Sequence, residues 1–377
     1  MFKKQLLFCL LIFVHANLFA QNLKVESEIQ TLMTELDAVG IAVAVVKDGQ
    51  LTYTKSFGYQ NLETKTPLAD NAIFRIASIS KSFSATAIMQ LVEAGKLSLD
   101  DDFGDLVGFK VRNPKFPNTK ITLKMVLSHR SSINDKEGYF NLDAINPDKN
   151  KNWANCYNDY EPGKGYQYCN LNFNMVGAVI EKFSGQRFDN YIKSKILTPL
   201  NLYAGYNVDS LDGNRFATLY EYDAKTKKFS AATAAYNPRR EEIKNYTLGY
   251  TTPIFSPTGG MKISAGDLAK YMMMHMNLGK ANDSRIISKK SAKIMQQQLS
   301  DEEGYGLAIT TVKDLIPNTI LKGHTGSAYG LYSSMFFDPK RKFGFVVITN
   351  GCNPVDLNGK NSLTSRTINI LYNNLIE

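Results

Sequence analysis

Apolar residues near the start of the chain gather in short, closely spaced runs. Residues 41–46 and 51–58 form two such runs, and Asp48-Gly49 lies between them. This pair favours a tight hairpin turn, because both residues tolerate the positive φ angles that such turns require. The sequence therefore predicts a polar helix over residues 22–37, followed by a two-stranded hairpin.

A second hairpin is predicted near the end of the chain. Residues 335–337 and 343–349 are apolar runs of strand length, and Asp338-Pro339-Lys340 between them is a turn sequence. Residues 361–376 have the composition of a closing helix. Strand patterns thus occur at both ends of the chain.

Helical patterns dominate between these ends. Residues 78–95 carry apolar residues at helical spacing and end at a glycine. Strand patterns fade from residue 97 to about 257, where shorter helices are predicted at 123–128 and 172–183. Ser264, with Asp267 three residues later, resembles a helix-capping sequence.

This order of elements predicts an α/β (α+β) fold with one antiparallel sheet built from both ends of the chain and flanked by helices. We expect a single catalytic domain over residues 21–377. Its α/β lobe would comprise about 21–97 and 258–377, and a mostly helical insertion lobe would comprise about 98–257. A ligand cleft is expected where the two lobes meet.

The first twenty residues have the features of an export signal. Lys3 and Lys4 precede the apolar stretch 6–14, which is too short to span a bilayer, and Ala20 provides a small residue for cleavage. We therefore expect a signal peptide at 1–20 and a periplasmic or secreted protein, with an uncleaved anchor as the alternative. No later segment predicts a transmembrane helix, so none is expected after signal cleavage.

Composition and charge narrow the class of protein. Hydrophobic residues make up 44% of the 377 residues, which suits a globular domain. The net charge of +9 becomes +7 without the two leader lysines, since 9 − 2 = 7, and it fits a lysine-rich surface or attraction to an anionic envelope. No basic run is interleaved with aromatic residues, which argues against nucleic-acid binding. We expect a monomer acting on a small-molecule or peptide substrate.

Cysteine and histidine usage predicts neither a disulfide scaffold nor a metal site. Three cysteines remain after cleavage: Cys156, Cys169 and Cys352. Because this number is odd, at least one thiol is free, and Cys156 and Cys169 either form a disulfide or are free buried thiols. The histidines outside the leader, His129, His275 and His324, show no metal-ligand spacing. We expect no metal and no cofactor.

One pair of residues suggests nucleophilic chemistry. Ser78 and Lys81 are the two ends of the only Ser-x-x-Lys in the chain. On a helix this spacing places both side chains on one face. A serine hydroxyl needs an adjacent base to become a good nucleophile, and a desolvated lysine with a lowered pKa can act as one.

The surroundings of this pair resemble a known family. Residues 74–83, Phe-Arg-Ile-Ala-Ser-Ile-Ser-Lys-Ser-Phe, are similar to the active-site helix of serine β-lactamases and penicillin-binding proteins. Tyr168-Cys169-Asn170 fits the Tyr-x-Asn of the class C and carboxypeptidase branches. His324-Thr325-Gly326 fits the third motif, with histidine in place of the commoner lysine. The three motifs occur in the family's order, and the resemblance covers nearly the whole mature chain.

The resemblance implies a role for each residue. Ser78 would be acylated, with Lys81 and Tyr168 as the catalytic base; which of these two takes the proton stays open. Asn170 would orient Lys81 and bind a substrate amide. The third motif and the residue after it are also expected to bind substrate: His324, Thr325, Gly326 and Ser327. The backbone N–H of Ser327 would contribute to an oxyanion hole. The side chains of His324 and Thr325 would hold a substrate carboxylate or complete a proton network.

The resemblance leaves the substrate open. A hydrolase of D-amino-acid peptides, esters or amides is the main expectation, because His324 resembles a D-Ala-D-Ala carboxypeptidase branch. A β-lactamase and a slow-turnover penicillin-binding or sensor protein are the alternatives. Ser131-Ser132 stands where relatives usually have Ser-Gly, from which we expect only a loop change, and His129 is expected to be structural rather than catalytic.

Overall fold

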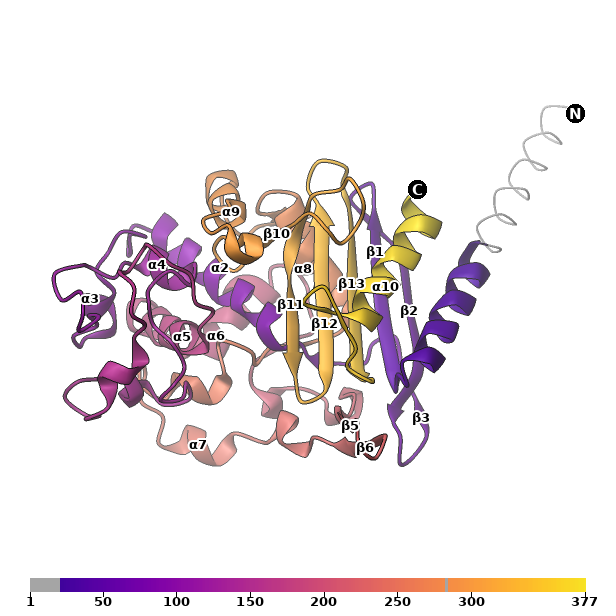
Figure 1. The fold of residues 1–377 in the computed structure, drawn as a ribbon, viewed down its shortest axis with the longest axis horizontal. Coiled ribbons are helices and arrows are strands. Elements are labelled where there is room, and N and C mark those ends of the chain that lie inside the picture. The colour runs from indigo at the N-terminus through magenta and orange to yellow at the C-terminus, as the bar shows by residue number, and fades with distance from the viewer. Residues whose placement is uncertain (1–20, 282–283) are drawn as a thin grey trace, which may run out of the picture.

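The computed structural model describes residues 21–281 and 284–377, so the expected leader at 1–20 lies outside it. A seven-stranded antiparallel sheet forms its centre, with the order β10-β11-β12-β13-β1-β2-β3 and helices on both faces (Figure 1). This confirms the predicted fold class. The strands are β1 (Gly40–Lys47), β2 (Gln50–Asn61), β3 (Thr66–Pro67), β10 (Thr310–Val312), β11 (Leu321–Ala328), β12 (Leu331–Asp338) and β13 (Phe343–Gly351).

Both predicted hairpins are present, and together they form the middle of the sheet. The β1–β2 turn uses positive φ angles at Asp48 (52°) and Gly49 (73°), as the Asp-Gly sequence predicts. The β12–β13 hairpin then lies beside β1, with Val43 opposite Val347. The two ends of the chain therefore share one sheet, as expected.

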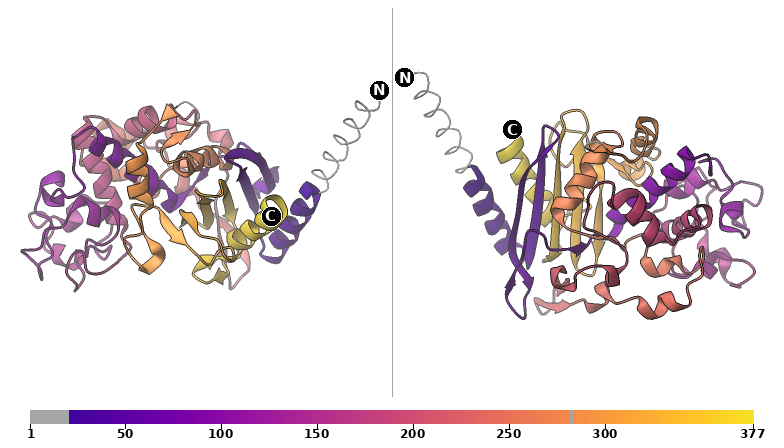
Figure 2. Two further views of the ribbon diagram at one scale, coloured as in Figure 1. Left: turned by 90° about the horizontal axis from the view of Figure 1, so that it is seen from above. Right: turned by 180° about the vertical axis from the view of Figure 1, so that it is seen from behind.

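Each face of the sheet has its own apolar core. The odd-numbered residues Ile41 and Val43 of β1 pack with an N-terminal helix over residues 21–35 and with α10 (Ser362–Leu371). The even-numbered residues of β1 pack on the other side, where α8 (Ala265–Met276) crosses the sheet. Figure 2 shows the two terminal helices side by side on one face. Because both faces are covered, β1 is buried along nearly its whole length.

The middle of the chain is mostly helical, with one small exception. Two of its helices reach the cleft: α2 (Ser80–Glu93), which follows the single turn η1 (Ala77–Ile79), and α5 (Asn170–Ser184). Residues 220–231 form a short hairpin where we expected no strands. The other elements labelled in Figure 1 are α3 (Phe103–Val107), α4 (Leu123–Leu127), α6 (Phe188–Ile192), β5 (Tyr220–Asp223), β6 (Lys228–Ala231), α7 (Arg240–Lys244) and α9 (Lys289–Gln296). The division into two lobes stays a prediction.

The three cysteines of the described residues are free and buried. The Cys156 thiol donates to the Ala144 carbonyl oxygen at 3.4 Å, and the Cys169 thiol donates to Asp135 at 3.2 Å. Of the two alternatives for Cys156 and Cys169, the structure thus has free thiols rather than a disulfide. No helix in the described ranges is long and apolar enough to cross a membrane.

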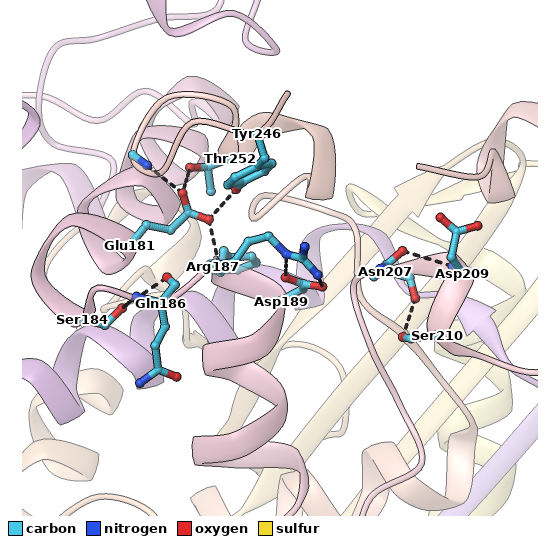
Figure 3. A network of polar contacts seen from close by, with 12 residues as sticks. Glu181, Ser184, Gln186, Arg187, Asp189, Asn207, Asp209, Ser210, Tyr246 and Thr252 are labelled. Carbon is cyan, nitrogen blue, oxygen red and sulfur yellow. Dashed lines mark hydrogen bonds and ion pairs between the residues drawn. The ribbon is translucent and has the colours of Figure 1, made fainter. Parts of the chain in front are cut away.

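A buried carboxylate fixes the far end of α5 (Figure 3). Glu181 is 1% exposed and accepts hydrogen bonds from Phe188 N (2.6 Å), Gly249 N (2.7 Å), Thr252 Oγ1 (2.6 Å) and the Tyr246 hydroxyl. These donors belong to the start of α6 and to the segment that leads toward residue 258. Glu181 therefore joins α5, the start of α6 and the segment 246–252.

We expect Glu181→Gln to lower the free energy of unfolding by about 2–3 kcal/mol, because an amide N–H₂ would face donors that need an acceptor. Urea unfolding monitored by circular dichroism measures this change. Glu241→Gln is the matched control: Glu241 is 81% exposed in its ion pair with Lys244, so its loss should cost less than about 0.5 kcal/mol. Equal stability of the two variants would contradict the proposed role of Glu181.

Candidate active site

Ser78 lies in η1, in a tight turn just before α2. The preceding residue, Ala77, has a φ of +49°, which is unfavourable for a residue with a Cβ. Hydrogen bonds on either side hold this turn: the Ser333 hydroxyl donates to Ile76 O at 3.0 Å, and Met261 N donates to Ser80 Oγ at 3.0 Å. Packing from two distant segments therefore holds Ser78 in a strained backbone.

The amine of Lys81 lies directly beside this serine. Lys81 is completely buried, and its Nζ donates to Ser78 Oγ (3.1 Å), Asn170 Oδ1 (2.9 Å) and Thr258 O (3.0 Å). Burial lowers the pKa of Lys81 to about 7. The uncharged amine is therefore well populated at neutral pH, which is the state that can accept a proton.

Tyr168 packs on the other side of this amine, with its ring centroid 4.7 Å from Lys81 Nζ. Burial raises the pKa of Tyr168, and the nearby Ser78 hydroxyl opposes part of that rise. Among the residues described, no group satisfies the buried Tyr168 hydroxyl with a hydrogen bond of ordinary geometry. Tyr168 itself lines the cleft, and its hydroxyl lies near that of Ser78.

Asp135, which the sequence analysis missed, holds Asn170 in position. Its carboxylate accepts from Asn170 N (2.8 Å), Asn170 Nδ2 (2.9 Å), Leu171 N (2.9 Å) and the Cys169 thiol. It thereby caps α5 from a distant loop, because Cys169 offers no side-chain cap of its own. Its charge also raises the pKa of Lys81, against the effect of burial. Asp135 and Asn170 are 35 positions apart, and no local sequence pattern links residues at that separation.

The four predicted residues of β11 alternate in their exposure. Thr325 and Ser327 are exposed toward the cleft, whereas His324 and Gly326 are buried. A Cβ on Gly326 would lie 2.3 Å from Ile76 O and 3.1 Å from Ser78 N. Only glycine therefore lets β11 pass this close to the turn that carries the nucleophile, and all eight predicted site residues come together around Ser78 or along the adjacent strand.

His324 is an uncharged part of the protein interior. Its Nε2 lies 3.0 Å from the Tyr305 hydroxyl, and its Nδ1 lies 2.5 Å from Thr325 O. Burial lowers the pKa of His324 to about 4. The imidazole is therefore neutral at physiological pH, donating from Nδ1 and accepting from the Tyr305 hydroxyl. Tyr305 is a second residue of the site that no sequence motif indicated.

His129 and Ser132 are structural. The His129 Nδ1 accepts a hydrogen bond from Cys169 N at 3.1 Å, and the ring is buried against Tyr168 with centroids 4.3 Å apart. Ser132 has a φ of +62°, which explains why glycine suits this position; its Oγ accepts from Asn113 Nδ2 at 3.0 Å. Both findings agree with the expectations of a structural histidine and a local loop change.

These residues border an open cleft of about 700 Å³. Ser78, Tyr168, Thr325 and Ser327 line it, together with residues 358–360. Across 21–281 and 284–377, no three His, Cys, Asp or Glu side chains are grouped to hold a metal ion. The cleft thus contains the Ser78 hydroxyl, with the buried Lys81 amine in contact with that hydroxyl and Tyr168 in the cleft wall.

The sequence profile named Beta-lactamase matches residues 25–364. The chain belongs to the beta-lactamase family. As a member of this family, it is a serine hydrolase. Among curated proteins, it is 27% identical to penicillin-binding protein 4 of Amycolatopsis lactamdurans over 345 residues, which cover 86% of this chain and 84% of that protein.

Solved structures of several relatives share the fold of this beta-lactamase-family protein. The octameric penicillin-binding protein homologue of Pyrococcus abyssi is 28% identical, with a TM-score of 0.73 over 92% of this chain and 76% of that one. The D-amino acid amidase of Ochrobactrum anthropi SV3 is 20% identical, with a TM-score of 0.71 over 94% and 99%. A class C beta lactamase of Rhodobacter sphaeroides is 18% identical, with a TM-score of 0.70 over 94% and 99%.

In this family member we expect Asp135→Asn to shift the pH dependence of Ser78 labelling by a fluorophosphonate. Labelling should rise as Lys81 loses its proton, near pH 7 in the wild type. Removing the Asp135 charge removes a stabiliser of charged Lys81, so the midpoint should move to lower pH. Asp143→Asn, which alters a surface ion pair with Lys149, is the control and should keep the wild-type midpoint. A reduced amplitude at an unchanged midpoint would show that Asp135 acts only as a helix cap.

Proposed function

We propose that this protein hydrolyses esters, amides or peptides of D-amino acids through an acyl-enzyme on Ser78. The contact between the buried Lys81 amine and the Ser78 hydroxyl carries this proposal, because it joins a nucleophile to a base whose pKa is about 7. The amidase named above, which shares only the fold, makes D-amino-acid derivatives a reasonable substrate class.

In the proposed reaction, the Ser78 oxygen attacks the substrate carbonyl while its proton passes to Lys81 or Tyr168. The tetrahedral intermediate then collapses, and the bond to the leaving group breaks as that group takes up the proton. Tyr168 suits this second transfer, because its hydroxyl is protonated, buried and unpaired among the described residues. Water then attacks the acyl-enzyme by the same route and releases the acid.

The proposed oxyanion hole consists of the backbone N–H groups of Ser78 and Ser327. The close approach of β11 to η1 at Gly326 supports this assignment, since it places two backbone segments on either side of the serine. Each such donor is typically worth about 3 kcal/mol of transition-state stabilisation. Asn170 suits the role of orienting Lys81, because its Oδ1 accepts from the Lys81 amine and its Nδ2 donates to Asp135.

We expect Ser78→Ala to abolish labelling by a fluorophosphonate and turnover of a p-nitrophenyl ester, while the melting temperature stays near that of the wild type. Labelling is read by intact mass spectrometry. Ser27→Ala, on the exposed face of the N-terminal helix, is the control and should react normally. Labelling of Ser78→Ala at the wild-type rate would refute the proposal. A penicillin adduct that forms and is then lost over time would favour a β-lactamase, and one that persists would favour a penicillin-binding sensor.

We also propose that the protein is exported and monomeric. The lysines and apolar stretch of residues 1–14 support export. N-terminal sequencing of the protein from cell-envelope and culture fractions should then begin near Gln21. A protein that retains its apolar stretch would instead be anchored.

The oligomeric state is tested separately. Light scattering after gel filtration should give the mass of one chain, and a larger mass would contradict the monomer.

A further inference from the structure

The charged groups in the cleft are arranged unevenly. Lys360 pairs with Asp314 at 3.0 Å on the rim, so its charge is largely matched. Lys313 follows Val312, which lies opposite Leu321, three positions before His324 in β11. Lys313 is one residue further along, so at about 3.3 Å per strand residue it lies roughly 13 Å along the strand from His324. The part of the cleft next to Ser78 therefore has no cation within the described residues other than the buried Lys81.

A carboxylate occupies this region instead. Glu303 lines the same cleft as Ser78 and Tyr168, and its charge is felt by the Tyr168 hydroxyl, whose pKa it raises. Its Oε2 accepts a hydrogen bond from the Tyr166 hydroxyl at 2.8 Å. No ion pair of the described residues includes Glu303, and its Oε1 has no hydrogen-bond partner among them. Glu303 is thus a positioned but uncompensated anion.

The backbone and the surrounding aromatic rings hold Glu303 in place. The next residue, Gly304, fits so closely against β10 that a Cβ on it would lie 2.3 Å from Thr311 O. The ring of Tyr166 lies 5.9 Å from that of Tyr305, and the ring of Tyr168 lies 6.1 Å from it. Tyr166, whose hydroxyl donates to Glu303, and Tyr168 therefore both pack around the buried ring of Tyr305.

We propose that Glu303 forms an ammonium subsite on the leaving-group side of the scissile bond. This rests on the proposed function, in which Tyr168 passes a proton to the leaving group and thus marks that side of the cleft. A leaving group with a positive charge gains from Glu303, whereas one with a carboxylate is repelled. The enzyme then prefers cationic leaving groups to the carboxylate-bearing ones of penicillins and D-Ala-D-Ala termini.

The geometry of His324 adds to this preference. A substrate carboxylate beside Thr325 needs a cation or free N–H donors. His324 offers neither, because it is 4% exposed and both its ring nitrogens already contact Tyr305 and Thr325 O. The position of His324 is therefore electrically neutral here, and the cleft that it borders contains the Glu303 carboxylate.

Three butyryl thioesters whose thiols carry a positive charge, no charge or a negative charge test the proposal. The thiols are 2-(trimethylammonio)ethanethiol, its neutral isostere 3,3-dimethylbutanethiol, and 3-mercaptopropanoate. Single-turnover thiol release reports acylation even if deacylation is slow. In the wild type we expect kcat/KM for the cationic thioester to exceed that for the anionic one by at least about fivefold, mainly through KM. Attraction of the cation and repulsion of the anion both contribute to this ratio, and each has the size expected for a partly exposed charge pair. This ratio should shrink as salt is added.

Two variants test whether the preference for the cationic thioester depends on the charge of Glu303. Glu303→Gln keeps the hydrogen bond from Tyr166 but removes the charge, so the cationic-to-anionic ratio should fall toward one. Glu302→Gln removes a neighbouring charge that does not line the cleft and should keep the wild-type ratio. An unchanged ratio in Glu303→Gln, or no reaction with the cationic thioester in a protein whose Ser78 is labelled, would overturn the ammonium subsite alone. Failure of Ser78 labelling would overturn the proposed function itself.

Discussion

The buried amine of Lys81 is the constraint on which the rest of the site depends. An ammonium group with no access to water is stable only if polar partners replace its hydration. Those partners come from three separate parts of the chain: Ser78 in η1, Asn170 at the start of α5 and the carbonyl of Thr258. If any one of these segments moves away from the others, the amine loses one of its three partners. The packing of the three segments against each other is therefore coupled to the hydrogen bonds of this nitrogen.

Other interactions maintain those three partners. The Ser84 hydroxyl donates to Pro257 O at 2.9 Å and so fixes the residue before Thr258 to α2. The Thr258 hydroxyl donates to Asn170 Oδ1 at 2.9 Å, which links the second and third partners directly. Asp135 fixes the first turn of α5, and Glu181 fixes its far end. The helix that carries Asn170 is thus held at both ends by a carboxylate.

Local patterns in the sequence predicted the two hairpins, α8 and the residues that meet at Ser78, because turn sequences, caps and motif spacings act over a few residues. They did not predict the β5–β6 hairpin, which is short and lies beside the end of β13. They also gave no indication of Asp135, Tyr305 or Glu303, whose roles arise only when distant segments meet. The charge of His324 was open for the same reason: burial decides it, and burial is a property of the folded chain.

The pairing of β1 with β13 also affects how the molecule can be made. Val43 and Val347 are neighbours in the sheet although about 300 residues separate them in the sequence. A ribosome delivers β1 long before its partner exists, so the nascent hairpin has an open edge for most of synthesis. Closing so large a loop is entropically costly and slow compared with local pairing. The sheet can therefore be completed only after nearly the whole polypeptide has emerged, which leaves an interval in which a chaperone or an export machine can hold the unfinished chain.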